Sequence, residues 1–140
     1  MANKIMRYAP HHTAISVRNL EQSLAFYEAL GFVEVHRYSD EAKTNVHLKL
    51  DHWYIEMFAF KQNHDKSPVE YEYANNLSEL GVKHIALSVD DVDAALAELK
   101  AKGLADDTTK INGDNLGDVR FFFIKDPDGV WIEIIRDDRY

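Results

Sequence analysis

Two glutamates lie where the chain is otherwise apolar. Glu56 lies within Trp53-Tyr54-Ile55-Glu56-Met57-Phe58-Ala59-Phe60, and Glu133 lies within Val130-Trp131-Ile132-Glu133-Ile134-Ile135. An ionised carboxylate in such a strand is costly unless it is paired, solvated or bound to a metal. His12 and His84 each open another stretch of alternating residues, on the face opposite its apolar side chains. Two histidines and two carboxylates suit a six-coordinate divalent metal with water in its open positions.

The chain has no cysteine, so neither disulfides nor thiolate ligands are possible. A metal must then be held by imidazole, carboxylate or carbonyl groups, which favour Ni, Zn, Co, Fe or Mn over Cu(I).

An internal repeat makes the four residues two equivalent pairs. The segment HTAISVRNLEQSLAFYEALGF from His12 aligns without a gap with HIALSVDDVDAALAELKAKGL from His84, which indicates a duplication. A lone His at a strand start, or a lone Glu in an apolar strand, is usually an ordinary surface residue. Because both recur at equivalent places, a shared site for one metal is the better interpretation. The other histidines lack this symmetry and are expected at the surface or rim: His11, His36, His47, His52 and His64.

Each half must position its pair with a strand, a helix and three further strands. The alternation at the start of each copy predicts a strand, and apolar residues at helical spacing predict the helix. Asn19 and Asp91 are the expected N-caps, and Gly31 and Gly103 lie where a helix ends with positive φ. The further strands are expected at about 32–38, 45–50 and 53–60, and at about 104–110, 118–125 and 130–136. The turn 126–129 joins the last two.

These elements predict an α+β fold with two tandem βαβββ modules, at about 8–60 and 82–137. We expect them to form one incomplete mixed β-barrel with its helices outside, so that residues 1–140 are a single domain. The polar stretch at about 61–81 is the connector, with one short helix near 70–80.

Composition and charge limit the classes of binding partner and indicate a cellular location. The net charge of −8 argues against nucleic acid and anionic membrane surfaces, which prefer a basic footprint. The first eight residues lack the apolar region of a signal peptide, and no apolar run is long enough to span a bilayer. A cytoplasmic location and a small-molecule partner are therefore expected.

The sequence resembles the glyoxalase I / bleomycin resistance / dioxygenase group, the vicinal oxygen chelate superfamily, from about residue 10 to 136. The resemblance lies in five segments: His12 to Val17, the helix from Leu20 to Phe32, Glu56, His84 to Val89, and Asp126-Pro127-Asp128-Gly129 with Ile132-Glu133. It implies the fold described above and frequent homodimerisation. Whether each site forms within one chain or across two is left open.

The resemblance also implies a chemistry. Glyoxalase I-like members bind one divalent metal through His or Gln, Glu, His and Glu, which correspond here to His12, Glu56, His84 and Glu133. They isomerise a thiohemiacetal to a thioester through an enediolate, and a carboxylate ligand, Glu133 or Glu56, moves the proton. Glu133 is favoured as the main base. The alternatives are an Fe(II)-dependent ring-cleaving dioxygenase and a non-catalytic protein that binds a drug or metabolite.

One departure concerns the thiol. Glutathione-dependent glyoxalases resemble one another in an Arg and an Asn that grip the γ-glutamyl carboxylate, and Ser16 and Phe60 stand at those places here. Loss of such a clamp costs roughly 2–5 kcal/mol of binding. Either a thiol other than glutathione serves, or the substrate is not a thiol adduct. Aromatic residues near the two glutamates predict an apolar substrate pocket: Tyr54, Phe58, Phe60, Phe121, Phe123 and Trp131.

Overall fold

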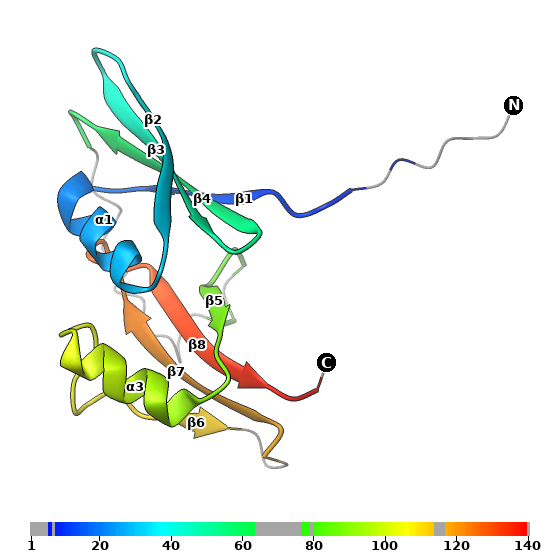
Figure 1. The fold of residues 1–140 in the computed structure, drawn as a ribbon. Helices are drawn as coiled ribbons and strands as arrows, with labels where there is room; N and C mark the ends of the chain where they lie inside the picture. The colour runs from blue at the N-terminus through cyan, green and yellow to red at the C-terminus, as the bar shows by residue number, and fades with distance from the viewer. Residues whose placement is uncertain (1–5, 7, 64–76, 79, 114–116, 140) are drawn as a thin grey trace, which may run out of the picture. The chain divides into compact units, whose positions relative to one another are not determined.

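The computed structural model describes residues 6, 8–63, 77–78, 80–113 and 117–139 (Figure 1). The chain divides into two compact units, Met1–His64 and Asp65–Tyr140, and each is described by itself. Most of the predicted connector, with its predicted short helix near 70–80, lies outside the described residues.

The first unit contains one helix and a four-stranded mixed sheet. Its elements are β1 (His12–Ser16), α1 (Leu20–Ala29), β2 (Val33–Ser39), β3 (Lys43–Leu50) and β4 (Trp53–Phe60). The strand order is β1-β4-β3-β2. β1 pairs with β4 in parallel, and the other neighbours are antiparallel. The first and last strands of the unit therefore lie side by side.

The second unit repeats this arrangement. Its elements are β5 (Ile85–Ser88), α3 (Val92–Ala101), β6 (Asn112–Gly113), β7 (Val119–Lys125) and β8 (Trp131–Asp137), with the strand order β5-β8-β7-β6. β5 pairs in parallel with β8, and the other neighbours are antiparallel. Helix α3 lies over β7 and β8 (Figure 1). The two open sheets give the chain a glyoxalase-like α+β fold of two βαβββ units.

The two helices begin and end as predicted. The side chain of Asn19 accepts a hydrogen bond from the backbone N–H of Gln22 (3.1 Å), and that of Asp91 accepts one from Ala94 (3.0 Å). These bonds satisfy donors that the first helical turn leaves open. Gly31 and Gly103 follow the helix ends with φ of 98° and 73°, a region that glycine enters without steric cost.

Each sheet has one buried apolar face, made by alternate strand residues. In the first unit Val46, Leu48, Ile55 and Met57 are fully buried. In the second unit the residues of this face are Ile85, Phe122, Ile124, Ile132 and Ile134. The intervening residues lie on the opposite face, and Glu56 and Glu133 are among them.

The predicted strand at 104–110 is wrong. The chain turns there, because the Asp106 carboxylate accepts hydrogen bonds from the backbone N–H (2.7 Å) and hydroxyl (2.5 Å) of Thr108. Such a local bond competes with the ladder of a sheet. Among the described residues the strand comes later, at Asn112–Gly113.

No helix in the described part of the chain has the length and apolar character needed to span a membrane.

Candidate metal centre and substrate pocket

His12 and Glu56 come together because β1 and β4 are neighbours. Ala14 lies directly opposite Glu56, and His12 lies opposite Tyr54. His12 Nε2 is 3.1 Å from Glu56 Oε2, and the side chains are 38% and 24% exposed. The first unit thus places one imidazole and one carboxylate in contact on the face opposite its apolar core.

Strand β3 provides further partners for Glu56. The Asn45 amide donates to Oε1 (3.2 Å), and His47 Nε2 lies 3.3 Å from the same oxygen. His11 Nδ1 is 2.8 Å from His12 Nδ1. A cavity of about 330 Å³ opens here, lined by His11, His12, His47, Tyr54 and Glu56.

His84 and Glu133 form the equivalent pair in the second unit. Ala86 lies opposite Glu133, as Ala14 does opposite Glu56. His84 Nε2 is 3.1 Å from Glu133 Oε2, and the side chains are 27% and 12% exposed. The two units therefore contain the same pair at the same spacing, and Glu133 is the more enclosed carboxylate.

Aromatic rings surround the second pair. Phe123 lies opposite Glu133 across β7 and β8, and its ring meets His84 edge-on at 5.3 Å. Phe121 and Trp131 each meet Phe123 edge-on, at 5.7 and 5.8 Å. The Glu133 carboxylate thus faces an apolar wall.

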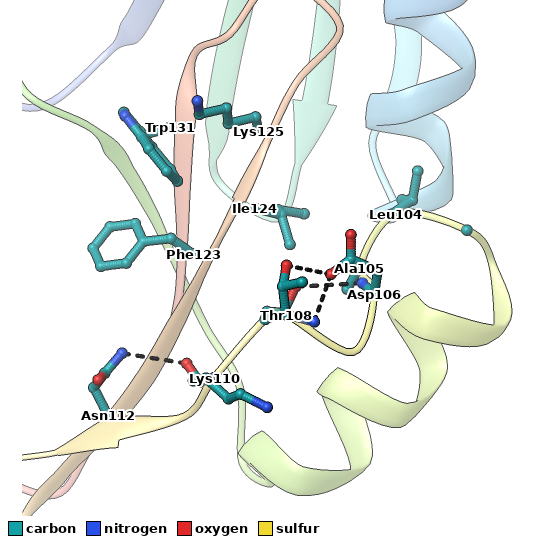
Figure 2. Close-up of a pocket in the computed structure, with 12 residues that line it drawn as sticks. Leu104, Ala105, Asp106, Thr108, Lys110, Asn112, Phe123, Ile124, Lys125 and Trp131 are labelled. Atoms are coloured by element: carbon teal, nitrogen blue, oxygen red, sulfur yellow. Dashed lines mark hydrogen bonds between the residues drawn. The ribbon is translucent and has the colours of Figure 1, made fainter. Parts of the chain in front are cut away.

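A larger cavity of about 570 Å³ adjoins this wall, between the loop 103–112 and β7 (Figure 2). Phe123, Trp131 and Lys125 line it from the sheet, and Thr108, Lys110 and Asn112 line it from the loop. Lys125 Nζ lies 4.5 Å above the Trp131 ring, a cation–π contact. The volume is within the range of small-molecule sites, and both polar and aromatic groups are present.

The remaining aromatic residues of the predicted pocket lie in the first unit. Tyr54 lines the smaller cavity and stacks with His11 at 6.0 Å. Phe58 and Phe60 stack with each other at 6.4 Å, and Phe60 is 41% exposed.

Arg120 is engaged within its own unit. Its guanidinium donates to both carboxylate oxygens of Asp93 on α3, at 2.6 and 3.2 Å. The hydrogen bond raises the pKa of Arg120 and lowers the pKa of Asp93. This ion pair connects α3 to β7. The cationic residues that line the larger cavity are Lys110 and Lys125.

Each His–Glu pair suits a metal by its chemistry and its spacing. Two ligands about 2.1 Å from one ion and at right angles to each other are about 3.0 Å apart, close to the 3.1 Å observed in both pairs. Over residues 6, 8–63, 77–78, 80–113 and 117–139, no group of three or more His, Asp or Glu side chains is arranged to hold a metal ion. Each unit by itself therefore presents a pair rather than a complete ligand set.

Sequence reasoning missed Asn45, and it treated His11 and His47 as surface or rim residues. The signal was present in Asn45-Val46-His47-Leu48, where polar residues alternate with apolar ones and share one face. What the sequence does not provide is the register that places His47 opposite Glu56. His64 lies outside the described residues.

Comparisons with known proteins extend over almost the whole chain. Residues 9–134 match the family model described as Glyoxalase/Bleomycin resistance protein/Dioxygenase superfamily. The chain is 35% identical to the protein YaeR of Escherichia coli, over 89% of this chain and 92% of that protein. It is 28% identical to a lactoylglutathione lyase of Schizosaccharomyces pombe, over 94% of this chain and 46% of that enzyme. The crystal structure of SMU.1112c matches with a TM-score of 0.73 and 26% identity, over 92% of this chain and 98% of that one.

Proposed function

The chain belongs to the glyoxalase/bleomycin resistance protein/dioxygenase superfamily, and we propose that it is a metal-dependent lyase of the glyoxalase I type. Its reaction is the isomerisation of a thiohemiacetal, formed from a 2-oxoaldehyde and a thiol, to a thioester. The observation that supports this most is the recurrence of one His–Glu pair at equivalent positions of both units.

We propose His12, Glu56, His84 and Glu133 as the ligands of one divalent ion, Ni, Zn, Co, Fe or Mn. Two imidazoles and two carboxylates are a donor set that these ions accept. When bound, such an ion polarises the two adjacent oxygens of the substrate and stabilises the negative charge that develops on them.

In this proposal Glu133 moves the proton between the two carbons. It is 12% exposed, and its partner among the described residues is His84. Phe123 stands opposite it and limits the access of water to this side of the carboxylate. A general base enclosed in this way exchanges its proton with the substrate rather than with solvent. Glu56, with its additional donors, is the ligand that stays in place.

The organic part of the substrate is proposed to contact Phe123 and Trp131 at the 570 Å³ cavity. The thiol is proposed to differ from glutathione, because Ser16 and Phe60 replace the residues of the usual carboxylate clamp. Phe60 is a partly exposed ring stacked on Phe58 and provides no donor.

The test is turnover of methylglyoxal by metal-loaded protein with glutathione, bacillithiol and other low-molecular-weight thiols, followed by the ultraviolet absorbance of the thioester. We expect turnover with at least one thiol and a higher kcat/KM with a thiol other than glutathione. Glu133→Gln, which lacks the proposed base, is the control for thioester formation that does not depend on this residue. Absence of turnover with every thiol and metal refutes the proposal.

A second candidate rests on His47. Its imidazole and that of His12 both contact the Glu56 carboxylate, and two His and one carboxylate bind Fe(II) in many oxygenases. These three side chains are not arranged as a metal site in the described structure, so this alternative requires them to rearrange around the ion. Under this alternative the protein is a ring-cleaving dioxygenase. Oxygen consumption with a panel of catechols after anaerobic Fe(II) loading tests it, and no consumption excludes it.

A further inference from the structure

The two glutamates have different neighbours at equivalent positions. His47 lies opposite Glu56, and Asn45 lies opposite Phe58, two residues further along β4. In the second unit the same positions relative to Glu133 are occupied by Phe123 and Phe121. The duplicated fold therefore surrounds one carboxylate with hydrogen-bond donors and the other with phenyl rings.

The donors around Glu56 share its oxygens unequally. Asn45 Nδ2 and His47 Nε2 both contact Oε1, at 3.2 and 3.3 Å, whereas His12 Nε2 contacts Oε2 at 3.1 Å. Hydrogen bonds to an ionised carboxylate are stronger than those between neutral groups. Two of them from one strand hold Oε1 toward β3 and leave Oε2 beside the imidazole of His12.

The role of His47 depends on its tautomer, which nitrogen spectra can assign. Its Nε2 bonds a carboxylate oxygen only if Nε2 has the hydrogen. A nitrogen with that hydrogen has no lone pair for a metal. The Nε2 atoms of His12 and His84 make the same kind of contact, at 3.1 Å, and in the proposed site they exchange that hydrogen for the metal. His47 differs in keeping it, as a donor to Oε1. This agrees with the absence, among the described residues, of a group of three His, Asp or Glu suited to a metal.

We infer that Asn45 and His47 are positioning residues, which hold Glu56 as a stationary ligand that offers only Oε2 to the metal. This inference rests on the proposed metal site. It explains how two halves with the same fold come to serve different roles: donors immobilise the carboxylate of the first unit, and the carboxylate of the second is left to move.

The experiment has two parts, both on the full chain. The first compares the zinc affinity of variants with that of the wild type, and the second records the nitrogen spectrum of His47 in the wild type. Asn45→Ala/His47→Phe removes both donors and introduces at position 47 the residue type found at 123. We expect its zinc dissociation constant to rise by about 10–100-fold, as when other supporting partners of metal ligands are removed. His47→Gln keeps a donor and is expected to bind zinc more tightly than His47→Phe. His36→Phe is the matched control, because His36 packs against His47 (5.4 Å between ring centroids) without a recorded contact to Glu56.

Long-range proton–nitrogen correlation spectra assign the tautomer of His47 with and without zinc. We expect the Nε2–H form in both states. Loss of that proton when zinc binds makes His47 a ligand, which overturns the inference and favours the dioxygenase alternative. Unchanged zinc affinity in the double variant also overturns it.

Neither measurement uses a substrate. Failure of the inference about Asn45 and His47 can therefore be distinguished from failure of the proposed lyase activity. A protein that binds zinc as expected but turns over no thiohemiacetal refutes the lyase and leaves the role of Asn45 and His47 standing. A wild-type protein that binds no zinc overturns both.

Discussion

At the scale of single residues, the two equivalent His–Glu pairs have different surroundings. His12 with Glu56 and His84 with Glu133 have the same 3.1 Å contact. Their surroundings diverge, because one carboxylate accepts bonds from Asn45 and His47 and the other lies beside Phe123. The two equivalent glutamates are therefore expected to respond differently to the same substitution.

Glutamine in place of each glutamate tests this difference. We expect Glu133→Gln to lower kcat by about 10²–10⁴-fold at saturating metal, because the group that transfers the proton is lost. Glu56→Gln is expected to weaken metal binding with a smaller fall in kcat once metal is saturating. The measurement is kcat with each thiohemiacetal over a metal titration. Equal losses of kcat in the two variants contradict the assignment of Glu133 as the base.

At the scale of elements, the helices are fixed by local signals that both units share. Asn19→Ala and Asp91→Ala each remove one N-cap bond, and each is expected to lower the free energy of unfolding by about 1 kcal/mol. The two caps share no partner, so their effects are expected to add. Urea denaturation of both single variants and the double variant measures this. Glu41→Ala, at an exposed residue between β2 and β3 and outside both helices, is a control.

The turn between β2 and β3 gives a prediction about pH. A hydrogen bond from Lys43 Nζ, with those from the backbone N–H groups of Ala42 and Lys43, lowers the pKa of Asp40 from 3.8 to about 2. A depressed carboxyl pKa stabilises the fold above the unfolded value, and this contribution is lost as the pH falls from about 4 to about 2. We expect Asp40→Asn to be less stable than wild type near neutral pH and to approach it at about pH 2. Tm values measured against pH check this, and an offset that does not vary with pH contradicts it.

The helices and strands could be predicted from the sequence more completely than the candidate site. Caps, glycines and strand periodicity depend on neighbouring residues, so α1, α3, β4 and β8 lie close to their predicted ranges. The strand expected at 104–110 failed because the side chain of Asp106 satisfies the backbone of Thr108. The two His–Glu pairs were found through the repeat. Asn45 and His47 were not, because their contact with Glu56 depends on the register of β3 against β4, which is not a local property.

At the scale of the whole molecule, the proposed metal site predicts that the stability of the two units is linked. An ion that binds only the folded state, at about 100 times its Kd, raises the free energy of unfolding by about 2.7 kcal/mol. We expect His12→Ala and His84→Ala each to remove most of this gain, because each breaks the same site. Thermal unfolding with and without zinc, before and after chelation, measures it. Full stabilisation in either variant shows that the pairs bind metal separately.

We also propose that the protein is a homodimer, and mixing two inactive variants shows which chains build a site. His12→Ala/Glu56→Gln and His84→Ala/Glu133→Gln are unfolded together and refolded. If a site takes its pairs from two chains, half of the random dimers regain one of two sites, or about a quarter of wild-type activity. If both pairs come from one chain, no activity returns.

The parallel pairing of β1 with β4 has a consequence for how the protein is made. His12 lies opposite Tyr54, which follows it by 42 residues (54 − 12), and β4 is the neighbour of β1 among the described strands. At 5–20 residues per second the ribosome needs about 2–8 s to add that stretch. During this interval the first strand of the nascent unit has no strand partner, and its apolar side chains are accessible to chaperones. β5 likewise pairs in parallel with β8, which is synthesised later. The duplication therefore repeats the interval without a strand partner as well as the His–Glu pair.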